Sequence, residues 1–504
     1  MWNWLGVAVA IVSGIFLSPY LIRKLGAEGY GVWVLVFSLI ENYWLFDLGL
    51  RSATVKYTAE YRATNETWRI NEIVNTGVVY FSAMAVLLMA GSWLLSRHVD
   101  RVFHISPAHT AEFQFLIVII GASWSFGMIF NVFNATLEGF QRFDISSRIW
   151  IVVTVIRVAG TAILLVLGYR LMALGLLVVA SQLFGYALSF LYVRRVFPEQ
   201  RFSLRFASLK TFRQLVSYGI HTVTGTIATQ LLNQSAPLII GRFRPVAHAG
   251  YYSVPTRLLQ YTGDAVSRVA LVTTSNASDL QARQEHAAIP RLGIIVNRYC
   301  LALFMPVAVF LLVYGEQLIR VWIRDAAYVT MSAPLIPILT LGTLIAVAAQ
   351  FNSGALLFGL GRHKRYTRAL LVEGIALVAG LWFLTPRFGI AGAAWISAIL
   401  MIIVRGLYTP WLVCRELRFS YAAYMHSIYT RPLLAAVPVF AAALWMERTL
   451  LPGRSLLQVL AAAAGIAAMY YAIALFGVIE RQHRAMVSGM IARRLKPVAG
   501  VQPA

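Results

Sequence analysis

The stretch Arg170-Leu-Met-Ala-Leu-Gly175 opens one apolar segment of this chain, and Arg387-Phe-Gly-Ile-Ala-Gly392 opens another in the same way. Two explanations are available: an internal duplication, or chance similarity between apolar helices. A second, looser pair of similar stretches is separated by nearly the same number of residues as the first pair. This favours the duplication, because one repeat then explains both pairs. The members of the looser pair are Ser18-Pro19, Arg23 and Gly29-Tyr30 in the first copy, and Ala236-Pro237, Arg242 and Gly250-Tyr251 in the second.

Apolar segments of membrane-spanning length run from one end of the 504-residue chain to the other. Hydrophobic residues make up 59% of the sequence and charged residues only 12%, which is more apolar surface than a soluble domain could bury. We therefore predict an all-α polytopic membrane protein with about fourteen transmembrane helices. The predicted segments are 2–22, 30–50, 76–95, 113–136, 149–168, 171–193, 214–240, 248–275, 292–313, 333–358, 367–385, 390–412, 432–446 and 456–479.

The repeat and the segments together predict the domain organisation. Six segments separate the two copies, so both copies keep the same membrane orientation. This predicts two six-helix lobes related by an axis along the membrane normal, an arrangement common in transporters whose substrate site lies between the repeats. The predicted domains are an N-terminal lobe, a basic cytoplasmic linker, a C-terminal lobe, two additional transmembrane helices and a basic cytoplasmic tail, at 1–195, 196–213, 214–415, 416–480 and 481–504.

The net charge of +23 indicates the orientation of the chain. Nucleic-acid binding would be one explanation, but the basic residues are scattered among apolar segments, so we expect no nucleic-acid partner. Lys and Arg accumulate in cytoplasmic loops. With the N-terminus inside, the most basic segments, 194–213, 362–368 and 481–496, all face the cytoplasm, which predicts that both termini are cytoplasmic. The segment 198–213 mixes Phe and Leu with Arg and Lys, and either lies along the inner membrane surface or is a plain basic loop.

Five arginines lie within the predicted spans. A charged side chain at bilayer depth costs at least ~2.5–3.5 kcal/mol on insertion scales, so it usually faces a protein interior or a watery cavity. Arginine suits a phosphate ligand, because its planar fork can donate two hydrogen bonds at once. Arg298 and Arg405 have no patterned partners, and we interpret them as interfacial or structural. The other three are Arg157, Arg257 and Arg268.

The eighth predicted span carries polar residues along one helical face. Arg257, Tyr261, Asp264 and Arg268 are spaced so that they share that face. Asp264 precedes Arg268 by four residues, the favourable order for an ion pair within a helix. No acidic residue lies within one turn of Arg257 on this helix. The pattern indicates that Arg257 contacts an anion in a central cavity.

The second predicted span holds Glu41 and Asp47. Either carboxylate could instead be the partner of Arg257, which leaves a structural ion pair as the alternative to an anion contact. Arg51 follows Asp47 by four residues, so we expect an Asp47–Arg51 ion pair. Glu41 is either a protonatable coupling group or a counter-ion to a cavity arginine.

Two further helical faces are polar. Thr222, Thr226 and Thr229 share one face of the seventh span, and Asn131 and Asn134 share one side of the fourth. Such a stripe lines a hydrated path or makes hydrogen bonds between helices, worth under ~1–2 kcal/mol each. The sequence does not separate these two interpretations.

Several chemical signatures are missing from the sequence. There is no Walker A pattern, no H-E-x-x-H and no G-x-S-x-G. The cysteines and histidines show no metal-ligand spacing. We therefore expect no cofactor, no metal site and no catalytic residues, and we expect that the chain does not drive transport with ATP on its own.

Several stretches of this sequence resemble the polysaccharide flippases of the Wzx type, which are members of the multidrug/oligosaccharidyl-lipid/polysaccharide exporter superfamily. The resemblance covers roughly residues 1–415. The stretches that carry it are Arg23-Lys-Leu-Gly-Ala-Glu-Gly-Tyr-Gly31, Phe46-Asp-Leu-Gly-Leu-Arg51, Tyr57-Thr-Ala-Glu60, Ile239-Ile-Gly-Arg-Phe243, Ala249-Gly-Tyr-Tyr-Ser253, Phe358-Gly-Leu-Gly-Arg-His-Lys364 and Gly389-Ile-Ala-Gly-Ala-Ala394.

The resemblance implies a V-shaped pair of six-helix lobes that alternate access in a bacterial inner membrane. It implies that the cargo is a polyprenyl-diphosphate-linked oligosaccharide, moved from the cytoplasmic to the outer leaflet, with glycosyltransferases and a polymerase as partners. Similar flippases use cavity arginines to meet the diphosphate, and the matching positions here are Arg23, Arg51 and Arg257. We expect Arg257 and Arg268 to make the main anion contacts, with Arg157, Arg51 and Arg23 in support.

Two other functions compete with this one. A multidrug-type antiporter on the same fold would need deep carboxylates that face a cationic drug, whereas deep arginines outnumber deep acids here. An integral-membrane polysaccharide polymerase or ligase is expected to carry a large outer loop with reactive side chains, and the sequence contains no such loop.

Overall fold

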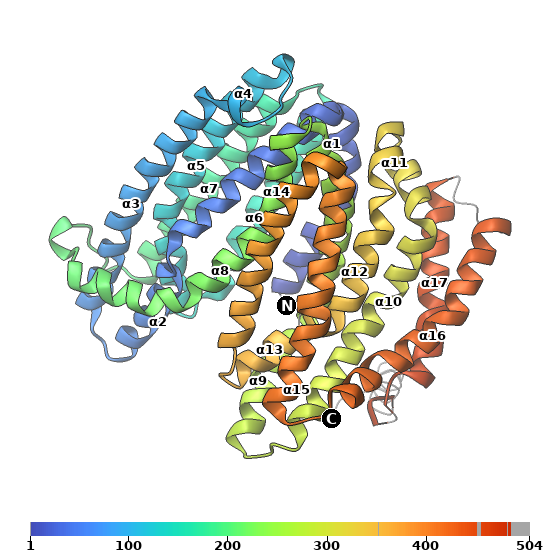
Figure 1. Ribbon diagram of the computed structural model, residues 1–504. Coiled ribbons are helices and arrows are strands. Elements are labelled where there is room, and N and C mark those ends of the chain that lie inside the picture. Colours follow the sequence, from blue (N-terminus) through green and yellow to red (C-terminus); the bar gives the residue numbers. More distant parts are fainter. Residues whose placement is uncertain (1, 351, 451–454, 481, 485–504) are drawn as a thin grey trace, which may run out of the picture. The chain divides into compact units, whose positions relative to one another are not determined.

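The computed structural model describes residues 2–350, 352–450, 455–480 and 482–484. In this part of the chain the regular structure is helical, apart from one isolated β-bridge between His104 and Pro245. Figure 1 shows the long helices that make up each part of the molecule. The predicted all-α fold class is confirmed. Residues 485–504 of the predicted basic tail lie outside the described residues.

The chain divides into two compact units, of which the first, unit 1, comprises Met1–Pro255, Ile323–Ser332 and Thr367–Ile396. It holds the first part of α9 (Ala247–Ala282) and most of α14 (Lys364–Leu400). Its other helices are α1 (Trp2–Glu41), η1 (Asn42–Asp47), α2 (Leu50–Ala63), α3 (Thr67–Arg97), α4 (Val99–Val102), α5 (Pro107–Gly139), α6 (Phe143–Val166), α7 (Leu171–Val196), η2 (Leu204–Phe206), α8 (Leu209–Phe243) and α11 (Ala326–Ser332).

The second compact unit, unit 2, comprises Thr256–Trp322, Ala333–Tyr366 and Ser397–Ala504. It holds most of α9 and the first and last residues of α14. Its other helices are α10 (Ala288–Trp322), α12 (Leu335–Gln350), α13 (Asn352–Gly359), the π-helical η3 (Met401–Tyr408), α15 (Thr409–Leu417), α16 (Tyr421–Thr449) and α17 (Leu456–Gly477). The predicted lobes 1–195 and 214–415 stay a prediction.

Each of the fourteen predicted segments falls on helical structure. Judged by length and apolar composition, the described residues contain nine helices able to cross a membrane, or ten if a bent pair that includes Leu50–Ala63 is one span. One of the nine, Lys364–Leu417, holds two predicted segments, and its backbone breaks at Gly389 with a φ of +61°. The first helix also joins two segments, across a break at Gly26 where φ is +73°.

The helices α8 and α9 are not among these nine. They coincide with the two predicted spans that carry polar stripes, and their hydroxyl, amide and charged side chains reduce the apolar content below that of the other spans. Helices of this kind in a membrane protein turn their polar face toward protein or water. The described parts of α8 and α9 therefore each carry a polar face.

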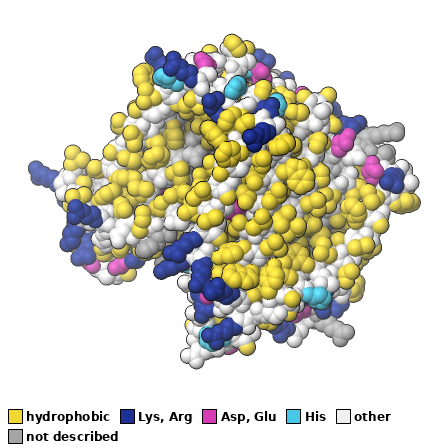
Figure 2. Space-filling model, in the orientation of Figure 1, with side chains coloured by type: hydrophobic (Ala, Val, Ile, Leu, Met, Phe, Trp, Pro, Cys, Tyr) yellow, Lys and Arg dark blue, Asp and Glu magenta, His cyan; other side chains and the backbone are white. Residues whose placement is uncertain are grey.

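Large apolar side chains remain exposed over much of the surface, as Figure 2 shows on one face of the molecule. On α3 they include Val86, Leu87 and Trp93, and on α16 they include Leu434 and Val437. A soluble protein of this size rarely exposes apolar patches so large. The exposed apolar faces are those that a bilayer would cover, which agrees with a multi-pass membrane protein.

Candidate functional site

The turn between η1 and α2 places the first group of candidate residues in unit 1. Leu48 and Gly49 both adopt left-handed backbone conformations there, with φ of +48° and +73°. A Cβ at Gly49 would lie 2.3 Å from the backbone oxygen of Gly219 on α8, so only glycine allows this approach. The close contact fixes the chain direction between Asp47 and Arg51.

Arg51 forms an ion pair with a residue of another helix. Its Nη2 lies 2.5 Å from Oε1 of Glu138 at the end of α5. The charges of Asp47 and Arg51 attract each other, but the two side chains form no direct ion pair, which corrects the prediction: the turn at Leu48 and Gly49 breaks the helical register that it assumed. The Oδ1 atom of Asp47 is buried and accepts no hydrogen bond within the described part of the chain.

Glu41 lies at the C-terminal end of α1, against α8. Its carboxylate accepts a hydrogen bond from Nε2 of Gln234, and its backbone oxygen accepts one from Nε2 of Gln230 at 3.1 Å. Glu41 takes part in further interactions as well. The two glutamine amides show that Glu41 has polar surroundings on the side that faces α8. Its two predicted roles, a coupling group and a counter-ion, both stay predictions.

The hydroxyl stripe of α8 makes its hydrogen bonds within its own helix. Thr222 donates to the backbone oxygen of Gly219 at 2.7 Å, Thr226 to that of Thr222 at 3.3 Å, and Thr229 to that of Gly225 at 2.9 Å. Thr222 and Thr229 are exposed. Among the described residues these hydroxyls make no bond to another helix, which favours a hydrated face over helix–helix hydrogen bonding.

Arg157 lies partly buried in the middle of α6. Its charge interacts with Tyr186 of α7, whose ring stacks on Phe130 with 5.4 Å between ring centres. In the part of the chain that the structure describes, Arg157 contacts no carboxylate. On α5, Asn134 accepts a hydrogen bond at 3.0 Å from Ser189 of α7.

Two predicted site residues of unit 1, Arg23 and Asn131, have few polar contacts among the described residues. Arg23 is exposed, and its Nε donates to the backbone oxygen of Pro19 at 3.2 Å. Asn131 is partly buried on α5. The structure brings neither of them into a polar cluster.

In unit 2, the predicted face of α9 is present as a continuous helical surface. Arg257, Tyr261 and Arg268 are partly buried and Asp264 is exposed. The charges of Asp264 and Arg268 attract each other, but the two side chains form no direct ion pair, which corrects the prediction. The Nε of Arg268 is buried and donates no hydrogen bond within the described part of the chain. Arg257 takes part in an interaction of its own.

Sequence reasoning missed Glu138 and Tyr186, which contact the predicted arginines. Glu138 follows Asn131 and Asn134 on the same helical face of α5, so its periodicity was a usable signal. Tyr186 had no such signal, because only the packing of α6 beside α7 brings it near Arg157. In the described part of the chain no three His, Cys, Asp or Glu side chains are placed to hold a metal ion.

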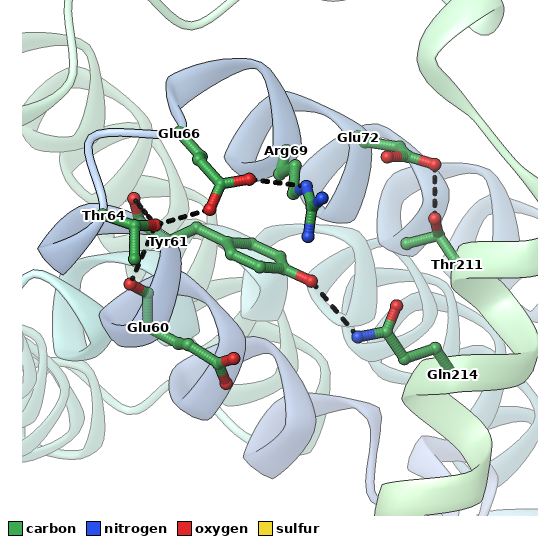
Figure 3. Close-up of polar contacts among 8 residues, drawn as sticks. All are labelled: Glu60, Tyr61, Thr64, Glu66, Arg69, Glu72, Thr211 and Gln214. Atoms are coloured by element: carbon green, nitrogen blue, oxygen red, sulfur yellow. Dashed lines mark hydrogen bonds and ion pairs between the residues drawn. The ribbon is translucent and has the colours of Figure 1, made fainter.

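The start of α8 is fastened to the end of α2 and the start of α3 (Figure 3). Gln214 donates to the Tyr61 hydroxyl at 3.3 Å, and Thr211 donates to the Glu72 carboxylate. On the same side, the Glu66 carboxylate lies 2.7 Å from Nε of Arg69 and accepts from Thr64 at 2.8 Å. The Gln214 and Thr211 hydrogen bonds hold the start of the helix that carries the hydroxyl stripe.

The segment before α8 is held by two asparagines of α3. Asn71 accepts from the backbone nitrogen of Arg201 at 2.7 Å and donates to the backbone oxygen of Glu199 at 3.1 Å. Asn75 accepts from the backbone of Ser203 at 3.0 Å and donates to that of Arg201 at 2.8 Å. The predicted basic linker therefore has a defined structure that includes η2 and ends in the first turn of α8. It presents Leu204 with 80% of its surface exposed.

The sequence of this chain is similar to one protein family and to several named proteins. The family described as "Polysaccharide biosynthesis protein" matches residues 2–267. A Shigella flexneri protein named "Putative O-antigen transporter" is 23% identical over 82% of this chain and 97% of its own length. A Bacillus subtilis protein named "Uncharacterized membrane protein EpsK" is 22% identical over 86% of each chain.

Solved structures show the same fold at low sequence identity. The lipid II flippase MurJ in an inward closed conformation matches with a TM-score of 0.73 at 13% identity, over 96% of this chain and 99% of its own. An inward-facing multidrug MATE transporter matches with a TM-score of 0.68 at 13% identity, over 82% of this chain and 95% of its own. The resemblance drawn from the sequence motifs is confirmed.

Proposed function

This chain belongs to the polysaccharide biosynthesis protein family, and on that premise we propose that it flips a polyprenyl-diphosphate-linked oligosaccharide from the cytoplasmic to the outer leaflet of a bacterial inner membrane. The oligosaccharide is the repeat unit of an O-antigen, capsule or exopolysaccharide. The name of the Shigella relative supports a glycan cargo, and the likeness to a lipid II flippase supports a lipid-linked one.

The main observation behind the proposal is that two partly buried arginines within the helices have no carboxylate of the described chain in direct contact. Among the described residues, neither Arg157 in unit 1 nor Arg268 in unit 2 is in direct contact with a carboxylate, and Nε of Arg268 is buried without a hydrogen bond. A guanidinium that leaves water without a direct ion pair is costly, so such sites favour an anionic ligand. A diphosphate offers several acceptor oxygens to the guanidinium fork.

Arg51, Arg23 and Arg257 complete the proposed set of cargo ligands. Arg51 shares its charge with Glu138, so its affinity for a diphosphate would be lower than that of an arginine without such a pair. Tyr261, the α8 hydroxyls, Asn131 and Asn134 would bind the sugar hydroxyls, with Asn131 and Asn134 on a different helix from the hydroxyl stripe.

Three carboxylates would adjust the charge of the cavity or couple transport to an ion gradient. Asp47 is the strongest candidate, because its Oδ1 atom is buried and accepts no hydrogen bond from the described residues. Glu41 and Asp264 are the others. We expect Asp47→Asn to keep cargo binding and to weaken the dependence of flipping on an imposed proton gradient; unchanged dependence would contradict this role.

The nearest competing function is a cation antiporter on the same fold, to which the likeness to MATE transporters points. The buried Asp47 oxygen favours this alternative, whereas Arg157 and Arg268 oppose it, because a cationic drug would be repelled. A polymerase or ligase is a weaker alternative. Both termini would lie in the cytoplasm, and glycosyltransferases and a polymerase would supply and consume the cargo.

The test uses purified protein in liposomes that contain a labelled polyprenyl-diphosphate oligosaccharide. We expect the labelled sugar to become accessible on the opposite leaflet, without any change in glycan length. Elongated or transferred glycan would support the enzyme alternative, and export of a cationic dye without glycan movement would support the antiporter.

The same liposomes test the arginine on α6. Arg157→Ala should remove most of the flipping activity, and Arg157→Lys should retain part of it, because lysine keeps the charge but not the fork. Arg148→Ala is the matched control, since Arg148 lies on the same helix but is exposed and paired with Asp144 at 3.8 Å. Equal activity of the two alanine variants would remove Arg157 from the cargo site.

A further inference from the structure

A pocket of about 620 Å³ opens at one end of unit 2, where the start of α10 meets the end of α15 and the first turns of α16. The chain that follows α17 closes one side of it through Glu480. None of the arginines predicted to bind cargo lines this pocket. Its walls are His286, Ala287, Pro290, Arg291, Ile294, Ile295, Arg298, Leu417, Arg418, Phe419, Ser427 and Glu480.

Arg298 is the buried cation of this pocket, with only 6% of its surface exposed. Its Nε donates to the backbone oxygen of Ser427 at 2.8 Å, which fixes the plane of the guanidinium. Its Nη1 is buried, lies 3.7 Å from Oε1 of Glu480, and donates no hydrogen bond to any described residue. Leaving a buried charged donor unsatisfied is costly, so a guanidinium held in this way is ready for an acceptor.

The pocket contains more positive than negative charge. Arg291 and Arg418 also line it, and Glu480 is the one carboxylate among its lining residues. Glu480 lies 3.3 Å from Nη2 of Arg291, so it is shared between Arg291 and Arg298. Three guanidinium groups against one carboxylate leave an excess of two positive charges. Arg431 is close enough to Arg298 to add repulsion, which a bound anion would relieve.

We propose that this pocket binds a phosphate group, with Arg298 as the buried ligand and Arg291 and Arg418 as the exposed ones. The excess of two charges matches a phosphate, and a guanidinium whose Nε is already used can still donate from its terminal nitrogens. The phosphate belongs either to a lipid headgroup or to a soluble phosphate compound. The proposal does not depend on what the protein transports.

The Glu480 carboxylate competes weakly with the phosphate for Arg291 and Arg298. It contacts both Arg291 and Arg298, and the chain around it is tied to α10, because His483 hydrogen-bonds the Tyr299 hydroxyl at 2.6 Å. A phosphate with a higher charge than a carboxylate would displace it from the two guanidiniums. Removal of this carboxylate should therefore strengthen phosphate binding, an effect opposite to that of removing an arginine.

The experiment measures binding to the purified full-length chain in a neutral detergent. One arm titrates inorganic phosphate and follows the thermal unfolding midpoint, because a ligand that binds only the folded state raises it. The other arm adds short-chain phosphatidic acid, which carries a terminal phosphate, or diacylglycerol of the same chain length as a phosphate-free control, and counts retained lipid by native mass spectrometry.

The variants separate the pocket from general surface charge. Arg291→Gln and Arg418→Gln should each weaken phosphate binding by about three- to tenfold, and Glu480→Gln should strengthen it by a similar factor, as expected for one charge at short range in a partly solvated site. Arg283→Gln is the matched control, because Arg283 is exposed, pairs with Asp279 and lies outside the pocket. Arg298→Gln should weaken phosphate binding most. Its binding data are compared with those of the wild type only if the two proteins have similar unfolding midpoints without ligand.

The outcomes are distinct. Retention of phosphatidic acid but not diacylglycerol, lost in Arg291→Gln and Arg418→Gln, identifies a lipid headgroup as the source. A phosphate-dependent rise in the midpoint with the same variant pattern identifies a soluble phosphate compound. Binding that is absent in both arms, or equal in Arg291→Gln, Arg418→Gln and Arg283→Gln, overturns the proposal.

Discussion

The Arg51–Glu138 ion pair joins α2 to α5, and we expect Glu138→Gln to lower the free energy of unfolding by about 1–2 kcal/mol. The pair is short, at 2.5 Å, and the Glu138 side chain is 16% exposed against 39% for Arg51. A hydrogen bond to a charged group contributes about 1.5–3 kcal/mol, and water around the more exposed Arg51 reduces this value. Glutamine keeps the size of the side chain, so the change removes mainly the charge.

The assay is thermal unfolding of the purified chain in detergent, followed by tryptophan fluorescence. For a chain of this size the midpoint should fall by about 1–3 °C. A cycle with Arg51→Gln and the double variant isolates the coupling between the two side chains. Asp279→Asn is the control, because its pair with Arg283 is similar in length, 3.0 Å, but 57% and 65% exposed, and should contribute little.

The same variants distinguish a structural arginine from a cargo ligand. If Arg51 also meets the diphosphate, Arg51→Gln should reduce flipping far more than Glu138→Gln, because only the first change removes a cation. Equal losses in both variants would limit Arg51 to a structural role. Additive effects in the stability cycle would refute the ion-pair reasoning itself.

Three further predictions concern other elements. Gly49→Ala should destabilise the chain by about 2–4 kcal/mol, because its φ is positive and a Cβ would meet the Gly219 backbone. The control Gly361→Ala should cost only about 1–2 kcal/mol, because Gly361 has a φ of +67° but nothing within 4 Å of its Cβ position. Equal shifts in the unfolding midpoint of the two variants would contradict the close contact at Gly49. Asn75→Ala should make the 199–208 backbone more susceptible to limited proteolysis than wild type, since two hydrogen bonds to it are lost, and an unchanged cleavage rate would show that Asn71 holds the segment alone. Arg257→Ala should block glycan export at normal protein levels while Arg257→Lys retains part of it, and full export in cells that carry the alanine variant would remove Arg257 from the cargo site.

The class of the fold and its helical segments were readable from the sequence because they depend on local composition. A run of about twenty apolar residues satisfies its backbone only as a helix in a bilayer, whatever its neighbours are. The predicted segments coincide with helices for this reason, even where two of them join across Gly26 or Gly389. The family resemblance was also readable, since its motifs are short and lie at fixed spacing along the chain.

The choice of charge partners was not readable in the same way. Asp47 and Arg51 have the spacing of a helical ion pair, yet Arg51 pairs with Glu138, which is 87 residues away in the sequence. Spacing rules hold only while the helix is continuous, and the turn at Leu48 and Gly49 interrupts it. Which carboxylate then meets the arginine depends on how α5 packs beside α2, and no local pattern encodes that.

Arg298 shows the same division most clearly. The sequence marked it as a cation within an apolar span and provided no partner for it. The tertiary structure surrounds it with the Ser427 backbone of α16 and with Glu480 beyond α17, and places Arg291 and Arg418 on the same pocket. Hydrophobic burial drives each helix into the membrane from its own composition, whereas a polar site needs several side chains from distant segments to meet, and only the packing of those helices decides that.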